Sequence, residues 1–379
     1  MTDLRSSSLN SLKPKLERAL ETAQTKLRGL VEHTPDFFPM YTRQGRWKHD
    51  GAQWTDWCAG FLAGQMWLIH GITGDAGWRA RAEHYSRLLE YKQHDRAVHD
   101  LGFIFLNTYL PWYRLTGNEH LHQVLITAGQ TLALRFQTKG QYLCSFVGPQ
   151  SLFIDIMMNV PIIFYAARET NDPALRSLAE AHCRTTEQFL VRDNGGTAHE
   201  GTFDTATGQF LFQSTHQGLN AESDWSRGLA WSLYGFGTVY TYTHDQADLE
   251  VACRNADHFL DRLPASFVPP WDFDAPAGDT RLHDSSAGAI AASGLLQLAQ
   301  LTAESRPARS QRYHAAAVNI VNALCDEQFL ACADPAWEGV LKHGVYHYHR
   351  GLGVDESVMW GDFFFLEAVC KLLADSSTA

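Results

Sequence analysis

The sequence predicts an all-α protein, an (α/α)6 barrel of six helical hairpins. Three observations support this. Apolar residues recur with helical spacing through most of the 379 residues. Short connections with Gly, Asn or Pro join the expected helices in pairs, as at 71–75, 116–118 and 170–173. Six acidic residues stand at or just inside the start of an expected helix: Asp56, Asp100, Asp155, Asp224, Asp284 and Asp355.

The periodicity predicts twelve helices in chain order: 11–30, 58–72, 76–94, 102–116, 120–137, 154–168, 172–190, 226–243, 245–263, 285–303, 308–328 and 358–374. The helices that begin at an acidic motif are apolar almost all round, whereas their partners carry Arg, Glu and Lys on one face. We therefore expect the first helix of each pair to line the inside of a closed ring and the second to cover the outside.

Two longer connections, 190–223 and 328–355, are rich in Gly, His, Thr and aromatic residues. Residues 203–210 resemble a hairpin turn, and long ordered connections in helical domains usually carry function. Because no change in composition divides the chain, we expect one domain over 1–379. An open superhelix of hairpins is the alternative, but such arrays normally keep a tighter period.

The bulk composition limits the function. A net charge of -11 argues against a nucleic-acid partner. The seven cysteines form no CxxC pair and are expected to be buried thiols. Neither a signal peptide nor a membrane-spanning segment is recognisable. We therefore expect a cytoplasmic protein, a monomer or homodimer without a membrane partner.

Parallel inner helices would bring their starts, and the acids there, to one mouth. Asp155 is flanked by apolar residues, so if it is buried it must be paired, hydrogen-bonded or have a raised pKa. Such a carboxyl can act as an acid near neutral pH. Asp100 follows His99 and can also be read as a simple helix cap.

Polar and aromatic residues are densest at 214–231. Gln217 and Arg227 can hold a hydroxyl and a carboxylate, and Trp231 lies one helical turn beyond Arg227. A capped helix with a structural arginine is the alternative. His343, His347 and His349 alternate in a second stretch, which we interpret as a pocket wall. No second cluster has zinc-site spacing and no nucleotide motif is present, so we expect no metal and no cofactor.

Together these stretches resemble the unsaturated glucuronyl hydrolases of glycoside hydrolase family 88. The likeness runs from about residue 54 to 373, and it rests on six motifs: HDLGF (99–103), FIDIMMNVP (153–161), HQG (216–218), DWSRGLAW (224–231), DSSAGAIAASGLL (284–296) and VDESVMWGDFFFLEA (354–368). The family has an (α/α)6 barrel, in agreement with the hairpin count.

The resemblance implies that Asp100 and Asp155 are the two essential aspartates. It also implies substrate contacts, and our binding candidates are His99, His199, Gln217, Arg227, Trp231, Trp57 and His343. Many members have a tryptophan where this chain has Leu62, so one stacking contact near the mouth differs.

The activity implied is release of an unsaturated 4-deoxy-hexuronate from the non-reducing end of oligosaccharides made by polysaccharide lyases. The C4=C5 bond is part of an enol ether, so a proton added at C4 leaves an oxocarbenium-like C5 that water attacks. We assign both proton donation and water activation to Asp155, with Asp100 tuning it.

Three alternatives remain open. An unsaturated rhamnogalacturonyl hydrolase would share the barrel and the chemistry but take pectin fragments. A conventional inverting glycosidase would cleave saturated chains. A saccharide-binding or scaffold protein would bind without turnover.

Overall fold

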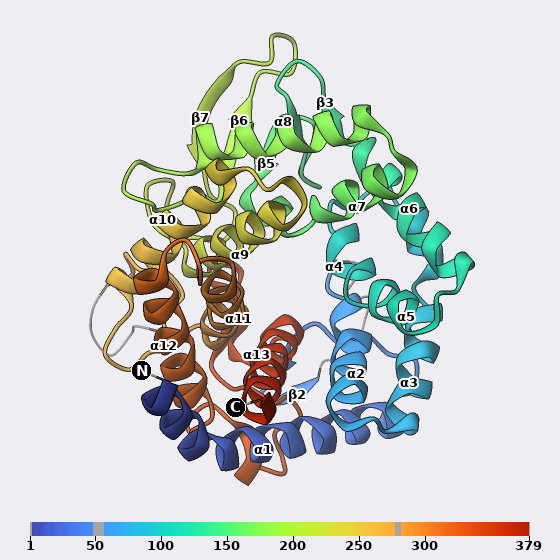
Figure 1. The fold of residues 1–379 in the computed structure, drawn as a ribbon. Helices are drawn as coiled ribbons and strands as arrows, with labels where there is room; N and C mark the ends of the chain where they lie inside the picture. Colours follow the sequence, from blue (N-terminus) through green and yellow to red (C-terminus); the bar gives the residue numbers. More distant parts are fainter. Residues whose placement is uncertain (1, 48–56, 277–281, 379) are drawn as a thin grey trace.

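The structure is a computed structural model that describes residues 2–47, 57–276 and 282–378, and it confirms the (α/α)6 barrel (Figure 1). The inner ring consists of α2 (Gly60–Thr73), α4 (Leu101–Phe105), α7 (Pro161–Thr170), α9 (Ser226–Thr243), α11 (Ser285–Leu301) and α13 (Met359–Thr378). The outer ring consists of α1 (Thr2–His33), α3 (Ala76–Arg87), α6 (Glu119–Ala133), α8 (Pro173–Leu190), α10 (Gln246–Arg262) and α12 (Pro307–Leu324).

The sixth hairpin joins the two ends of the chain, because α1 packs along α13 in the wall of the ring (Figure 1). From Ser11 on, the buried apolar residues of α1 recur at helical spacing on one face: Leu12, Leu16, Ala19, Ala23, Leu27 and Leu30. The first and last expected helices therefore close the barrel together.

Two inner helices differ from the expectation. The predicted helix 102–116 is broken into α4 and α5 (Tyr109–Thr116). At the break, Asn107 Nδ2 donates to the Phe103 carbonyl (2.8 Å) and Thr108 Oγ1 donates to the Ile104 carbonyl (2.7 Å), so side chains bond carbonyls at the interruption.

The predicted helix 154–168 was wrong at its start. Residues Ile154–Met158 form a 3-10 helix, η2, and the α-helix begins only at Pro161. Proline is well suited to the first turn of a helix, since it lacks an N–H and has a fixed φ. Similarly, α3 ends at Arg87, and the 3-10 helix η1 (Glu90–His94) continues the predicted segment.

The long connections form small antiparallel sheets. β5 (Ser151–Phe153), β6 (Glu200–Phe203) and β7 (Phe210–Ser214) pair in that order, which confirms the hairpin turn at 203–210. The connection 328–355 contains the 3-10 helices η3 (Ala331–Ala333) and η4 (Tyr348–Arg350) and the strand β8 (Gly344–His347), which pairs with β9 (Leu352–Glu356). Two shorter pairs are β1 (Thr42–Arg43) with β2 (Arg46–Trp47) and β3 (Phe136–Gln137) with β4 (Tyr142–Leu143).

The acidic motifs do not all begin helices. Asp100 and Asp284 are N-cap residues of α4 and α11, and Asp224 precedes α9 by two positions. Asp355 instead lies in β9, four residues before α13, so that expectation was wrong. Asp56 lies outside the described residues. None of the helices in the described ranges has the length and apolar character that crossing a bilayer requires.

Candidate active site

A pocket opens at the end of the barrel where the inner helices begin. Its lining comprises Trp57, His99, Asp100, Phe146, Phe153, Asp155, His216, Gln217, Arg227, Trp231 and Tyr346. The structure therefore brings seven of the nine candidate residues into one lining, and His199 lies directly behind it. His343 is the exception.

Close backbone packing brings the segment with Asp155 against α4 and α9. Asn159 joins the two acids' segments, because its Oδ1 accepts from the Phe103 N–H (2.7 Å) and its Nδ2 donates to the Asp155 carbonyl (3.2 Å). A Cβ on Gly102 would lie 2.5 Å from the Asn159 Cα, and one on Gly235 would lie 2.7 Å from the Met157 carbonyl carbon. Glycine at these two positions lets α4 and α9 approach η2 closely.

Strand register sets His199 opposite Asp155. Phe153 pairs with Glu200 across β5 and β6, and the Ile154 N–H donates to the His199 carbonyl (3.0 Å). Asp155 lies two residues after Phe153, and His199 lies one residue before Glu200. As a result, His199 Nε2 lies 3.9 Å from Asp155 Oδ1.

The backbone fixes the tautomer of His199. Its Nδ1 accepts from the N–H groups of His216 (3.2 Å) and Gln217 (3.1 Å), so the proton of the neutral ring is on Nε2 and faces Asp155. Burial lowers the pKa of His199 well below its usual value, which keeps the ring neutral.

Asp155 has the properties of an acid poised for proton transfer. Its side chain is 15% exposed, and its Oδ1 is buried without a hydrogen-bond partner among the described residues. Burial raises the pKa of Asp155 to about 7, while the charge of Arg227 opposes this increase. A carboxyl with this pKa is present in both protonation states near neutral pH.

Asp100 has a matching histidine neighbour. His99 Nδ1 accepts from the Phe146 N–H (3.1 Å), so its Nε2 carries the proton and lies 3.4 Å from Asp100 Oδ1. Burial lowers the pKa of His99 to about 3. Burial first, and then the nearby charge of Asp155, raises the pKa of Asp100 well above its usual value. The two carboxyls therefore share one apolar site and compete for ionisation.

Arg227 is a fixed cation in the pocket wall. Its Nη1 donates to Asp284 Oδ2 (3.3 Å) and to the Val345 carbonyl, and its Nη2 donates to Gln217 Oε1 and to the Tyr346 carbonyl (2.8 Å). These four bonds occupy the Nη donors, so Arg227 is not the free carboxylate clamp we expected. Gln217 accepts through Oε1, which leaves its amide N–H donors for a ligand.

Two tryptophans line the pocket differently. Trp231 is only 1% exposed and packs against Phe103, with ring centroids 4.9 Å apart. Trp57 is half-buried and packs against Trp360, with ring centroids 4.5 Å apart. Trp57 thus has the more accessible ring for a sugar. Leu62 is fully buried and does not line the pocket, so this departure from the family does not reach the pocket lining.

The His-rich segment contributes in an unexpected way. His343 Nδ1 pairs with Asp355 Oδ1 (2.6 Å), and His343 does not line the pocket. His347 is 4% exposed, and neither of its ring nitrogens has a partner among the described residues. Its ring lies 5.4 Å from that of His216.

The sequence reasoning missed three lining residues: Phe146, Phe153 and His216. Tyr346 lies in the His-rich stretch that was expected to form a pocket wall, and it does line the pocket. His216 lies in the HQG motif and Phe153 in the Asp155 motif, so the motifs carried a signal for both. Phe146 had no such signal. Over the ranges that the structure describes, no group of three or more His, Cys, Asp or Glu side chains could hold a metal ion.

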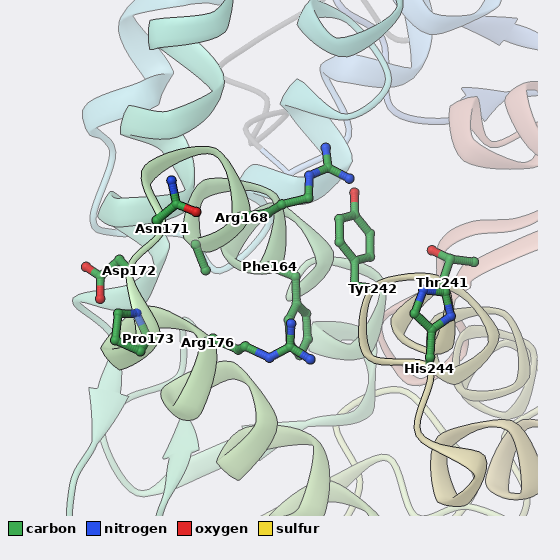
Figure 2. A pocket seen from close by; sticks show the side chains of 10 residues that line it. Phe164, Arg168, Asn171, Asp172, Pro173, Arg176, Thr241, Tyr242 and His244 are labelled. Carbon is green, nitrogen blue, oxygen red and sulfur yellow. The ribbon is translucent and has the colours of Figure 1, made fainter.

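A larger hollow, of about 510 Å³, lies at the opposite end of the barrel, where α7 and α9 end (Figure 2). Its two arginines are paired, Arg168 with Glu169 (2.7 Å) and Arg176 with Glu180 (2.8 Å). Its Asp172 caps α8 by accepting from the Ala174 N–H. The hollow lacks a pair of buried acids, so size does not mark the reactive site here.

Comparison with known proteins shows the family to which the chain is similar. Residues 32–265 match the family described as Glycosyl Hydrolase Family 88. An unsaturated glucuronyl hydrolase from Bacillus sp. (strain GL1) is 34% identical over 330 residues, which cover 84% of this chain and 86% of the relative. An unsaturated chondroitin disaccharide hydrolase from Streptococcus pneumoniae is 29% identical over 334 residues, covering 85% and 83% of the two chains. The crystal structure of an unsaturated glucuronyl hydrolase specific for heparin matches with a TM-score of 0.88 at 29% identity, covering 96% of this chain and 98% of that chain.

Proposed function

Since the chain belongs to glycosyl hydrolase family 88 and is a hydrolase of the unsaturated glucuronyl class, we propose that Asp155 carries its chemistry. The substrate is a lyase-generated oligosaccharide with a Δ4,5-unsaturated uronate at its non-reducing end. Relatives named for chondroitin disaccharides and for heparin favour glycosaminoglycan fragments. The reaction separates the unsaturated uronate from the next sugar, and the uronate leaves as a 4-deoxy keto acid because its double bond is consumed.

The reaction begins at the alkene. Asp155 transfers its proton to C4, and the ring oxygen stabilises the positive charge that develops at C5. Water then adds to C5 and returns a proton to the Asp155 carboxylate, so the residue is restored. The hemiketal opens and the glycosidic bond breaks with loss of the next sugar as an alcohol. Because no group attacks the anomeric carbon, the spacing rule for retaining and inverting carboxylates does not apply.

The state of Asp155 is the observation that carries this proposal. Its Oδ1 is buried and has no hydrogen-bond partner within the described parts of the chain, and its pKa of about 7 lets it give and take a proton in turn. The His199 Nε2–H faces the same oxygen and favours the carboxylate that remains after protonation of C4. The buried charge of Arg227 acts in the same direction.

Asp100 and the other lining residues support that step. Asp100 shares the apolar site and favours a protonated partner through repulsion. The Gln217 amide donates to a substrate oxygen, and the ring of Trp57 covers an apolar sugar face. Trp231 and Arg227 act from within the wall, by packing and by charge. His343 has no part in the proposed site.

Replacing Asp155 by Asn tests the proposal. Asp155→Asn removes the only proton that we route to C4, so the ultraviolet absorbance of the conjugated acid should persist with an unsaturated disaccharide. Asp355→Asn is a matched control, because it is the same substitution at an aspartate that pairs with His343 and lies outside the pocket lining. Near-normal turnover by Asp155→Asn, with the control equally active, would refute the assignment.

A substrate panel separates the remaining choices. It should contain unsaturated disaccharides from chondroitin, heparin, hyaluronan, gellan and ulvan, with and without sulfate, and an unsaturated pectin fragment. We expect turnover of glycosaminoglycan disaccharides and none of saturated chains. A preference for the pectin fragment would favour the rhamnogalacturonyl class, and binding without loss of absorbance would favour a binding protein.

The proposed setting of the enzyme is the cytoplasm, as a monomer or homodimer. None of the seven cysteines, all of which lie in the described ranges, forms a disulfide, and five of them are buried, in keeping with a reducing compartment. Light scattering after size exclusion gives the oligomeric state, and cell fractionation gives the location.

A further inference from the structure

Arg135 lies behind the pocket and joins two separate stretches of chain. It follows α6 and does not line the pocket. Its Nε donates to the Cys144 carbonyl (2.8 Å), its Nη2 to the Ser145 carbonyl (2.5 Å) and its Nη1 to the Arg96 carbonyl. One planar guanidinium therefore ties residues 144–145 to the stretch that leads into His99.

The tied segment contacts the surroundings of both acids. The Phe146 N–H donates to His99 Nδ1 (3.1 Å), and the two rings stack at 5.8 Å with an interplanar angle of 11°. The Ser145 N–H donates to the Ser151 carbonyl (2.7 Å) at the start of β5, the strand that leads to Asp155. The position of this short segment thus affects the orientation of His99.

We propose that Arg135 is a positioning residue of the reaction, because its three carbonyl contacts hold the Phe146 N–H on His99 and so keep the His99 Nε2–H directed at Asp100. The inference rests on the proposed function, since it needs Asp100 to work beside Asp155. Without the tie, His99 can turn or change tautomer, and Asp100 loses its fixed donor.

Arg135 also acts through its charge, which changes the pKa of Asp100. An uncharged side chain that only packs would not have this effect. Among the described residues, His99 lies beside Asp100, and the charges of Asp155 and Arg135 act on it, with Arg135 lowering the pKa of Asp100. Behind these, His182 faces His99, while Arg227 and His199 face Asp155. Removing Arg135 therefore raises the pKa of Asp100. Because Asp100 acts as a carboxylate, turnover falls as the pH drops through this pKa, and this acid limb of the pH–rate profile should move to higher pH.

Two variants separate the contacts from the charge. Arg135→Met removes both, and we expect kcat to fall by about 10–100-fold with a much smaller change in KM. Arg135→Lys keeps the charge but cannot reproduce the planar three-carbonyl contact. It should return the acid limb towards that of the wild type while kcat stays reduced. Arg312→Met is the matched control, because Arg312 is a half-exposed arginine of α12 paired with Asp257 and Asp261.

The outcomes are distinct. Wild-type kcat and an unmoved acid limb in Arg135→Met would overturn the inference, as would a loss that equals the loss of folded protein measured by circular dichroism. If Arg135→Met does not fold, Arg135→Lys decides the question, and wild-type kcat in that variant overturns the inference. An inactive wild type on every unsaturated disaccharide would instead refute the proposed function, and this inference with it.

Discussion

Each aspartate of the pocket faces a neutral imidazole whose proton is placed by the backbone. His99 and His199 accept backbone N–H groups at Nδ1 and therefore present Nε2–H to Asp100 and Asp155. Burial raises the pKa of Asp155 to about 7, and a neutral donor opposes this increase less than a second cation would. This arrangement keeps a proton available near neutral pH.

The pH dependence of turnover follows from Asp155. Because its proton is consumed at C4, kcat/KM should fall as the pH rises through about 7. A pH–rate profile on an unsaturated disaccharide measures this limb. A profile that stays flat well into the alkaline range would contradict the role of Asp155.

The same carboxyl should reduce stability. Its folded pKa of about 7 lies above the unfolded value of about 3.9, so the folded state binds more protons between these values. The free energy of unfolding therefore decreases as the pH rises through this window. We expect Asp155→Asn to be more stable than the wild type at pH 8 and equal to it near pH 3, by urea denaturation. Equal stability at both pH values would contradict the raised pKa.

The sequence predicted most of the residues that the structure brings into the pocket, but not the contacts that each of them makes. The motifs pointed to Asp100, Asp155 and Gln217, and the family resemblance pointed to His199. Arg227 looked like a free clamp because a sequence does not reveal that Asp284 and two carbonyls already occupy its donors. These contacts cross 57 to 119 positions of the chain, and only tertiary packing sets them.

At the level of elements, α9 packs against the short helix η2, and α4 contacts Asn159 at the end of η2. Periodicity could predict the long helices, since it depends on local burial, but not the break after α4 or the 3-10 start at Ile154. The β5–β6 register, which brings His199 to Asp155, was also invisible, although the hairpin after β6 was predicted. Register depends on partners far apart in the chain.

The contact between Gly235 and η2 can be tested. In Gly235→Ala the new methyl group would meet Met157 at 2.7 Å, so the segment with Asp155 must shift. We expect a destabilisation of about 1–3 kcal/mol. The loss of kcat should be larger than the loss that the unfolded fraction of the variant would cause. Gly71→Ala is the control, because a Cβ there meets nothing within 4 Å. Equal kcat in both variants would show that the spacing is not needed for activity.

At the scale of the whole molecule, the barrel depends on its two ends. α1 and α13 complete the ring together (Figure 1). The pocket lies at the end of the barrel where α4 and α9 begin. We therefore propose that the chain unfolds as one unit. The sequence predicted six hairpins but could not show that the last one pairs the first helix with the last.

A core substitution in α1 tests this cooperativity. Leu16 is fully buried, and Leu16→Ala should cost about 2–5 kcal/mol and lower the single Tm of the molecule. The kcat well below Tm should be unchanged, because α1 contributes no residue to the pocket lining. Calorimetry with two separate transitions would show instead that the α1–α13 hairpin melts by itself.

Turnover in deuterium oxide tests the central claim most directly. If the Asp155 side chain exchanges with solvent and delivers its proton to C4, NMR at the earliest times should find one deuterium at C4 of the released uronate, on a single face. Early sampling matters because the keto product exchanges its own C4 hydrogens later. Release of the sugar with C4 unlabelled and the double bond intact would contradict the account.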